Sequence, residues 1–338
     1  MTRGFPEIND VVLTTEAPLG EVALIKDRNV ALAQRIITLR GFKDKLDNKF
    51  LKYWFQSEYG QYELDSRASG TTVFGIKASV LKKIPVPVPS LPEQQAIASV
   101  LSALDDKIDL LQRQNQTLEQ MAATLFRQWF IEEAKEEWEE VTIGDLCAIV
   151  TKGTTPKSFT TLGVNFIKAE SLSGNGAFIK NKFAYISEEV HFNSLKRSVL
   201  QKGDLLFSIA GTIGRVAIVT EDILPANTNQ ALAILRPREI NYSNFIYCIL
   251  KSSLFQGMVD SKVVHAVQPN LSLGEISNSS LRLPKKLVLN QFVDLIEPFF
   301  IKIRFNIQQL ETLQSLRDTL LPKLISGEVR LKGFETVS

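Results

Sequence analysis

The side chains best able to do chemistry are few and scattered in this sequence. The two histidines, His191 and His265, lie far apart and have no cysteine or carboxylate neighbours at the spacing of metal ligands. Cys147 and Cys248 lie among apolar residues and form no CxxC pair. The stretch Gly211–Gly214 lacks the lysine of a phosphate-binding loop and is predicted to turn between two strands. No GxSxG serine motif, Gly-rich cofactor loop or Asn/Asp-Pro-Pro-aromatic box is present. We therefore expect no catalytic residue, no metal and no cofactor.

The composition is that of a folded protein with more than one domain. The chain has 338 residues, of which 44% are hydrophobic and 22% charged, and this length predicts two or three domains. It contains no run of 18 uncharged apolar residues and no signal peptide at its start. With two isolated cysteines and no sign of disulfide pairing, we expect a cytoplasmic protein that does not enter a membrane.

Charge is unevenly distributed along the chain. The net charge is +3 over residues 1–90, −7 over 91–140, +6 over 141–286 and zero over 287–338. Two mildly basic stretches are compatible with a polyanionic partner, but excesses of this size are common in other proteins. Charge alone therefore does not identify a partner.

The sequence repeats itself at a distance of about 195 residues. Asp10–Ile25 matches Asp204–Val219 at an offset of 194, and the apolar positions and one glycine coincide. Phe50–Ser57 matches Phe245–Ser252 at an offset of 195. These matches predict a tandem duplication.

The two copies differ at their starts. The second copy begins near Trp138, and its first 63 or so residues, up to Gly203, should have counterparts before Asp10, where only nine residues stand. We therefore expect the first copy to lack roughly 50 to 60 residues at its beginning. A truncated gene, a rearranged allele or a deliberately shortened chain would each produce this pattern.

Each copy ends in a long helix with a 3.5-residue apolar period. The first helix follows a proline-rich stretch, with Pro92 in its first turn. Ten consecutive positions of this kind are typical of a coiled coil. The expected seams are Ile97, Leu101, Leu104, Ile108, Leu111, Asn115, Leu118, Ala122, Leu125 and Trp129, and Phe292, Ile296, Phe299, Ile303, Asn306, Leu310, Leu313, Arg317, Leu320 and Leu324.

Each seam has one asparagine near its middle. In an antiparallel pair with full overlap, Asn115 and Asn306 would face each other, and a buried amide pair would penalise slipped registers. The alternative is that one or both lie at the rim of the seam and are hydrated.

The remaining parts of both copies consist of short apolar runs between Gly, Asn, Thr and Pro clusters, which predicts strands and loops. Lys49–Tyr62 and Tyr242–Leu254 have helical spacing. The predicted fold class is therefore α+β, with two β-rich domains, each followed by a long coiled-coil helix. The expected segments are a partial first β-rich domain at 1–90, the first helix at 91–137, the second β-rich domain at 138–286, and the second helix with the C-terminal tail at 287–338.

This organisation resembles the specificity (S) subunit of type I restriction-modification systems. Ser90–Phe130, SLPEQQAIASVLSALDDKIDLLQRQNQTLEQMAATLFRQWF, looks like the central conserved region of that family, and Leu313–Leu331, LQSLRDTLLPKLISGEVRL, looks like its C-terminal one. Val150–Pro156, VTKGTTP, is similar to a loop that opens a recognition domain. The resemblance covers about Asp10 to Leu331 and departs from the family at the shortened start.

The resemblance implies a non-catalytic DNA reader. Each β-rich target recognition domain would read one half of a split, asymmetric site in double-stranded DNA. The two helices, forming an antiparallel coiled coil, would hold the two domains apart and set the spacing. Two modification subunits, which carry S-adenosylmethionine and methylate adenine, and restriction subunits would be the partners, and a homodimer is possible given the short first domain. The alternative is a truncated or silent specificity cassette that no longer reads a full bipartite site.

The resemblance also directs attention to polar loop residues. Bases in the major groove are read by small or bidentate polar side chains, and phosphates are bound by Lys, Arg, Thr and backbone amides. The candidates in the second domain are Lys152, Gly153, Thr154, Thr155, Lys157, Lys168, Glu170, Ser208, Gly211, Thr212, Asn227, Thr228, Asn229, Lys262, His265, Gln268 and Asn270, and those in the first domain are Arg67, Ser69, Thr71 and Thr72. For each of them the alternative is a loop residue that caps a turn or a strand.

Overall fold

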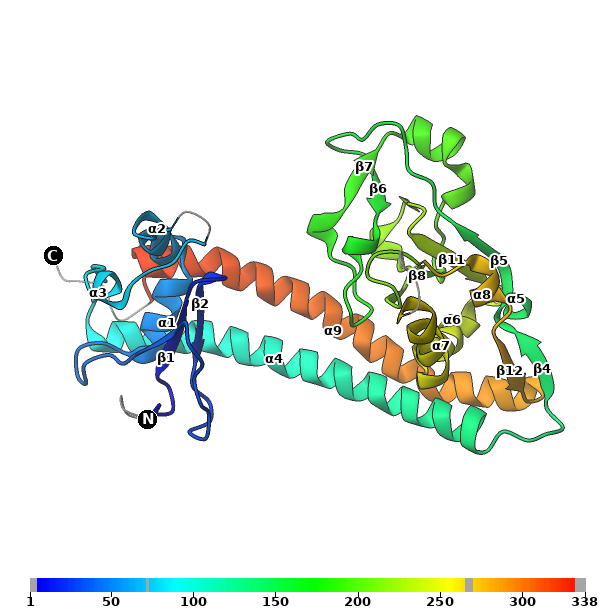
Figure 1. Ribbon diagram of the computed structural model, residues 1–338, viewed down its shortest axis with the longest axis horizontal. Helices are drawn as coiled ribbons and strands as arrows, with labels where there is room; N and C mark the ends of the chain where they lie inside the picture. The colour runs from blue at the N-terminus through cyan, green and yellow to red at the C-terminus, as the bar shows by residue number, and fades with distance from the viewer. Residues whose placement is uncertain (1–4, 71–72, 265–269, 332–338) are drawn as a thin grey trace. The chain divides into compact units, whose positions relative to one another are not determined.

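The computed structural model describes residues 5–70, 73–264 and 270–331. The described chain forms two compact units, one made of residues 1–112 and 308–338 and the other of residues 113–307. Each unit therefore combines one β-rich part with a portion of both long helices, α4 (Leu91–Arg127) and α9 (Lys286–Ser326) (Figure 1). The two units divide the chain differently from the four expected segments, because the helices pack with the β-rich part beside them.

The first unit contains a three-stranded antiparallel sheet in the order β2-β1-β3. Val11 and Leu13 of the central strand are fully buried against Trp54 and Leu64. The predicted helix at 49–62 is two helices, because Ser57 ends the first and its hydroxyl caps the second. The elements are β1 (Val11–Thr15), β2 (Leu19–Leu24), β3 (Ile36–Leu39), α1 (Asn48–Gln56), α2 (Glu58–Ser66) and α3 (Ala78–Leu81).

The second unit is built around a four-stranded sheet in the order β5-β11-β8-β9. Every residue of β8 is buried, and its side chains alternate between two hydrophobic clusters, with Phe207 on the side of α6 and Leu206 on the other. The elements are β4 (Glu139–Thr142), α5 (Ile143–Leu146), β5 (Cys147–Lys152), β6 (Val164–Ile167), β7 (Ala184–Ile186), β8 (Leu205–Ser208), β9 (Val216–Ile218), β10 (Ala226–Thr228), β11 (Leu232–Pro237), α6 (Ser243–Lys251), α7 (Ser253–Val264), α8 (Leu273–Ser277) and β12 (Ser280–Leu283).

The duplication is visible in matching side-chain contacts. Asp10 receives two hydrogen bonds from Arg40, of 2.6 and 2.7 Å, and Asp204 receives two of 2.7 Å from Arg236. Both aspartates are only 1% exposed, and the arginine holds the pKa of Asp10 below its usual value. The two sheets therefore share one skeleton, in which β1, β2 and β3 correspond to β8, β9 and β11.

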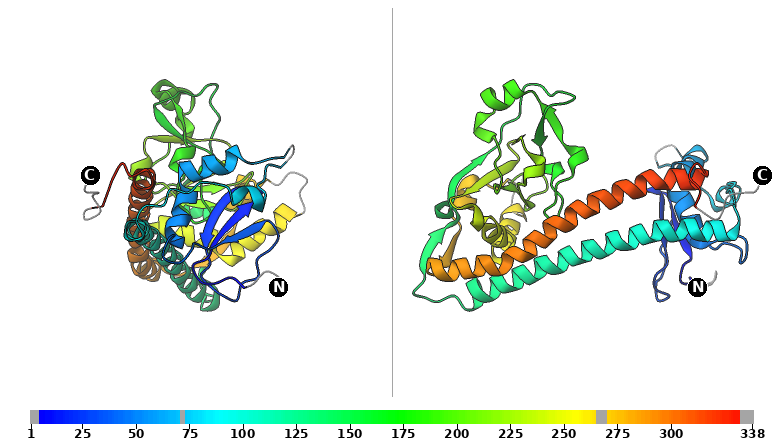
Figure 2. Two further views of the ribbon diagram at one scale, coloured as in Figure 1. Left: turned by 90° about the vertical axis from the view of Figure 1, so that its left-hand side faces the viewer. Right: turned by 180° about the vertical axis from the view of Figure 1, so that it is seen from behind.

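The two long helices are antiparallel within each unit, as the sequence predicts. In the first unit Ile97 and Leu101 of α4 share a cluster with Leu324 of α9, and in the second unit Phe126 packs on Phe292 at a ring-centroid distance of 6.2 Å. Residues near the start of α4 thus contact residues near the end of α9, and residues near the end of α4 contact residues near the start of α9. The views in Figure 2 show the helices side by side.

The seam differs from the expected one at the end of α4. Phe126 and Phe130 are buried there, whereas Leu125 and Trp129 are only partly buried. Phe130 packs on both Phe245 of α6 and Phe292 of α9. This end of the helix therefore directs Phe126 and Phe130 toward the β-rich part of the second unit. The reason is that the large buried rings there offer more apolar contact than a two-helix seam alone.

The two seam asparagines face each other in the second unit. The amide nitrogen of Asn306 donates to the amide oxygen of Asn115 at 2.8 Å, and the side chains are 0% and 6% exposed. The expected contact is therefore present. The amide oxygen of Asn306 has no hydrogen-bond partner among the described residues, so this polar pair is only partly satisfied and carries a cost in stability.

We predict that replacing both asparagines by leucine raises the free energy of unfolding by about 1 kcal/mol or more, because a partly satisfied polar pair gives way to apolar contact. The same substitution should loosen the register. Denaturant unfolding measures the first effect. Cysteine pairs placed in the native and in shifted registers measure the second, and cross-linking confined to the native register in the double variant would contradict the proposed role.

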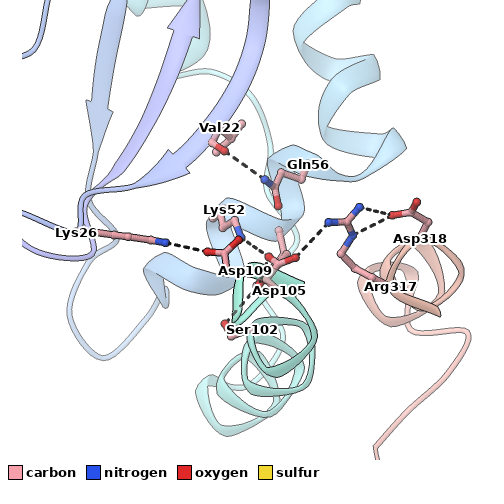
Figure 3. A network of polar contacts seen from close by, with 10 residues as sticks. Val22, Lys26, Lys52, Gln56, Ser102, Asp105, Asp109, Arg317 and Asp318 are labelled. Carbon is pink, nitrogen blue, oxygen red and sulfur yellow. Dashed lines mark hydrogen bonds and ion pairs between the residues drawn. The ribbon is translucent and has the colours of Figure 1, made fainter. Parts of the chain in front are cut away.

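A polar network joins α1 to both long helices in the first unit (Figure 3). Asp105 of α4 accepts hydrogen bonds from Lys52 and from the Tyr53 hydroxyl, each at 2.7 Å, and Arg317 of α9 lies 3.3 Å away. Burial opposes ionisation of Asp105, but the hydrogen bonds from Lys52, Tyr53 and Arg317 and the charge of Lys52 outweigh it and lower its pKa. Asp105 therefore acts as the common anion of this junction.

We predict that Asp105→Asn destabilises the chain by about 1–3 kcal/mol at pH 7, because Lys52 and Arg317 lose their counter-charge. A carboxylate whose pKa is lowered on folding contributes stability above its unfolded pKa of about 3.9, and this contribution is lost as the pH falls through the folded value. The difference between variant and wild type should therefore shrink below about pH 4. Urea unfolding at several pH values checks this, with the neighbouring exposed Asp106→Asn as control. A difference independent of pH would contradict it.

Candidate nucleic-acid interface

Strand register brings three loops of the second unit to one end of its sheet. Lys152, the last residue of β5, pairs with Ala233 near the start of β11, and Ser208, the last residue of β8, pairs with Leu232. Because neighbouring strands are antiparallel, the end of β5, the start of β11 and the end of β8 lie at the same end of the sheet. The loops at 153–157, 229–231 and 209–215 therefore lie together.

The loop after β5 is held against the segment that precedes β11. The backbone nitrogen of Thr154 donates to the Thr228 carbonyl at 3.0 Å, and the Thr155 hydroxyl donates to the side chain of Gln230. A Cβ atom on Gly153 would lie 2.0 Å from the Thr228 carbonyl oxygen. Glycine is needed at this position because the two backbones approach too closely for a side chain.

The loop leaves polar and basic side chains in solvent. Lys152, Thr154, Thr155 and Lys157 are exposed, and Arg197, which sequence reasoning missed, donates to the Thr154 hydroxyl at 3.3 Å. Exposed lysines and hydroxyls on one loop suit contacts with phosphates. Arg197 could not be found from the sequence because it is 43 residues from Thr154 and has no motif of its own.

The turn between β8 and β9 forms the neighbouring part of this surface. Gly211 and Thr212 are exposed, and Gly211 has a φ of +73° with open space where a side chain would lie. Exposed Asn270 pairs with Ala210 in an isolated antiparallel bridge. The predicted strand-to-strand turn is confirmed, and it lies beside Asn270. His265 and Gln268, the remaining candidates of that loop, lie outside the described residues.

Three predicted contact residues have another role in the structure. Ser208, Asn227 and Thr228 are completely buried. The Ser208 hydroxyl accepts from the backbone nitrogen of Arg215 at 2.8 Å, and the Thr228 hydroxyl donates to the Ile167 carbonyl at 2.8 Å. The Asn227 amide nitrogen donates to the Leu195 carbonyl at 2.9 Å, and its oxygen bonds to buried His191. These side chains are buried and hold the loops, which differs from the exposed position expected of residues that contact DNA.

The other candidates in the second unit form ion pairs or hydrogen bonds with neighbouring residues. Lys168 forms an ion pair with Glu170 at 2.6 Å, and Lys262 forms one with Glu275 at 3.1 Å. Both pairs remain accessible, so solvent weakens them and a phosphate could compete for either lysine. Asn229 is half-buried, and its side-chain oxygen accepts from the backbone nitrogen of Ala231, so it helps to form the turn.

In the first unit the structure describes two of the four candidate DNA-binding residues, Arg67 and Ser69. Arg67 is half-buried and bonded to Glu63, the residue four before it on α2, so its charge is already paired. Exposed Ser69 pairs with Gly75, which also bridges to Glu16 at the end of β1. Thr71 and Thr72 lie outside the described residues. Only Ser69 is thus placed near the end of the sheet that matches the loop surface of the second unit.

The described residues contain neither a metal-binding cluster nor a reactive thiol. They contain no group of three or more His, Cys, Asp or Glu side chains close enough to hold a metal ion. Burial raises the pKa of the Cys147 thiol to about 12 and that of Cys248 above its ordinary value, so neither is a reactive thiolate at neutral pH. Within these residues, no helix is both long and apolar enough for a bilayer. The polar loops are therefore the principal candidate site.

Comparison with known proteins decides the family. The family model described as the type I restriction modification DNA specificity domain matches residues 3–120 and 135–315, one stretch in each copy of the duplication. The chain belongs to the type I restriction-modification specificity family. The resemblance found in the sequence is therefore confirmed, as is the fold class.

Relatives of this specificity family support the assignment over nearly the full chain. The type I restriction enzyme MjaIX specificity subunit of Methanocaldococcus jannaschii is 29% identical over 363 residues, which cover 98% of this chain and 79% of the relative. The EcoBI specificity subunit of Escherichia coli is 24% identical, over 88% of this chain and 69% of the relative. The solved S subunit of the type I restriction-modification system from M. genitalium has the same fold, with a TM-score of 0.58, 22% identity, and coverage of 95% of this chain and 84% of that one.

Proposed function

We propose that this chain is the non-catalytic subunit that selects the DNA sequence for a type I restriction-modification complex. The observation that carries the proposal is the gathering of exposed Lys152, Thr154, Thr155 and Lys157 with the turn at Gly211 and Thr212 at one end of the second sheet. Buried hydrogen bonds beneath these loops hold them in place, and such preorganised polar loops are suited to reading base edges and phosphates. The relatives named as specificity subunits support this reading.

The duplicated skeleton supports a bipartite site. Each copy has its own buried Asp–Arg pair, Asp10 with Arg40 and Asp204 with Arg236, and its own glutamine that donates to the carbonyl of a positive-φ glycine, Gly20 or Gly214. Two domains with one architecture and different loops would read two different half-sites. We therefore propose a split, asymmetric target in double-stranded DNA.

The long helices are proposed to dock the modification subunits, which would carry S-adenosylmethionine and perform the methylation, while restriction subunits complete the complex. In the second unit, α9 exposes Ile301 and Phe305, at 53% and 52%, and α4 exposes Met121 at 44%. Large apolar side chains on an exposed helix face are typical of protein contacts.

Lys152→Ala should weaken binding to all DNA sequences by several-fold and reduce the slope of log affinity against log salt by about 0.9, because one phosphate contact is lost. Fluorescence anisotropy with target and unrelated duplexes at several salt concentrations measures both. Lys202→Ala is the matched control, because this exposed lysine, in an ion pair with Glu221, precedes β8 and so lies at the opposite end of the sheet from Lys152. Equal effects of the two substitutions would contradict the placement of the site.

Co-expression with a modification subunit of the same system tests the bipartite reading. We expect the two chains to purify together and the host genome to carry methylated adenine in a split asymmetric motif, which long-read sequencing detects. A symmetric motif would show that the second domain works twice in a homodimer. Co-purification without methylation would support the alternative of a cassette that has lost its reading function.

A further inference from the structure

A tight turn places Gln230 at the centre of the loop surface of the second unit. The backbone nitrogen of Leu232 donates to the Asn229 carbonyl at 3.2 Å, so Gln230 and Ala231 form the corner of a four-residue turn. The Ala231 carbonyl in turn accepts from the backbone nitrogen of Ile209 at 2.9 Å, which joins this turn to the one that follows β8. Because β11 lies between β5 and β8, the exposed Gln230 side chain stands between the loops that leave these two strands.

A neighbouring hydroxyl sets the orientation of the Gln230 amide. The Thr155 hydroxyl donates to the Oε1 atom of Gln230, which directs this oxygen toward the loop after β5. The Nε2 group carries two hydrogens, and no described residue accepts a hydrogen bond from it. The side chain therefore presents hydrogen-bond donors to solvent, with its oxygen already bonded to the protein.

The same surface separates positive charge from this neutral amide. Lys152 and Lys157 are exposed on the loop after β5, and exposed Arg197 donates to the Thr154 hydroxyl. Such cations are suited to the phosphates of a DNA backbone, whereas an uncharged amide with a defined orientation is suited to the edge of a base. Gln230 thus has the chemistry of a specificity-determining residue.

The first unit has an exposed glutamine at the equivalent place. Counted back by 196 residues, Gln230 corresponds to Gln34, which precedes β3 as Gln230 precedes β11. Neither of the two residues that flank the glutamine is the same in the two copies. An exposed side chain contributes little to folding stability, so the retention of glutamine between diverged neighbours points to a ligand.

We propose that Gln230 reads one base of the DNA target and that Thr155 makes it a donor to that base, an inference that rests on the proposed function. In the major groove guanine presents its O6 oxygen and thymine its O4 oxygen, whereas adenine and cytosine present amino groups. A side chain that offers its amide nitrogen therefore selects guanine or thymine. A glutamine free to turn would pair with adenine through both atoms of its amide.

The test maps methylated adenine in a host that co-expresses the full chain with a modification subunit of the same system. Gln230→Ala should relax one position of the methylated motif, with discrimination there falling by about tenfold. We expect the wild-type motif to hold guanine or thymine at that position, and the base found tells the two apart. Long-read sequencing measures the methylated fraction for each base. Gln201→Ala is the matched control, because exposed Gln201 precedes β8 at the opposite end of the sheet.

Two further variants test the polarity of the contact. Gln230→Glu replaces the donors by acceptors and should shift the preference at this position to adenine or cytosine. Thr155→Val keeps the shape of the side chain but lets the amide turn, so adenine should be accepted beside the original base. Adenine or cytosine at this position of the wild-type motif would contradict the assigned orientation and overturn the proposal.

The remaining outcomes separate this inference from the proposed function. If Gln230→Ala weakened methylation at every sequence and left the base preferences unchanged, Gln230 would only support the loop, and the inference would be wrong. A motif unchanged in Gln230→Ala, Gln230→Glu and Thr155→Val would also overturn it, while the proposed function would stand. Absence of both DNA binding and methylation in the wild-type complex would contradict the proposed function and this inference together.

Discussion

The antiparallel pairing of α4 and α9 is the constraint on which both units depend. Each unit completes its core with residues from both helices, such as Leu101 and Leu324 in the first and Phe126 and Phe292 in the second. A slip of one helix would therefore disturb apolar contacts in each unit and separate Asn115 from Asn306. The helices are thus part of both cores, and their register is determined by the packing of the β-rich parts as well as by their own seam.

The two copies keep one skeleton and differ where they meet the helices. The Asp–Arg pair is retained in both, because each buried aspartate needs its arginine. At the junction with the helices, Lys52 and Asp105 of the first copy correspond to Tyr247 and Phe300 of the second, and Arg317 corresponds to Ala122. A salt-bridged junction thus occupies the place of a packed pair of rings 5.4 Å apart. Placing the charged residues of the first junction in the second, or the rings of the second in the first, would bury unpaired charges against aromatic rings. The cost would be several kcal/mol.

The same division between skeleton and surface applies to the loops of the second sheet. Below the surface, the side chains of Ser208, Asn227 and Thr228 form hydrogen bonds with neighbouring backbone and side chains. Above them, Lys152, Thr154 and Thr212 remain exposed. Loops whose buried base is fully hydrogen-bonded can vary in their exposed outer residues without disturbing the fold.

The sequence by itself determined the duplication and the two long helices, because apolar periodicity and internal matches are local or linear properties of a chain. It left open whether Asn115 and Asn306 face each other or lie at the rim of the seam. It also indicated the loops at 152–157 and 211–212. It did not separate Ser208 and Asn227, which are buried, from Lys152, which is exposed, because burial depends on which strands become neighbours. Only the tertiary structure brought Arg197 to Thr154 and turned Phe126 and Phe130 into the core. Each of these depends on contacts between residues far apart in the sequence, and such contacts leave no periodic signal.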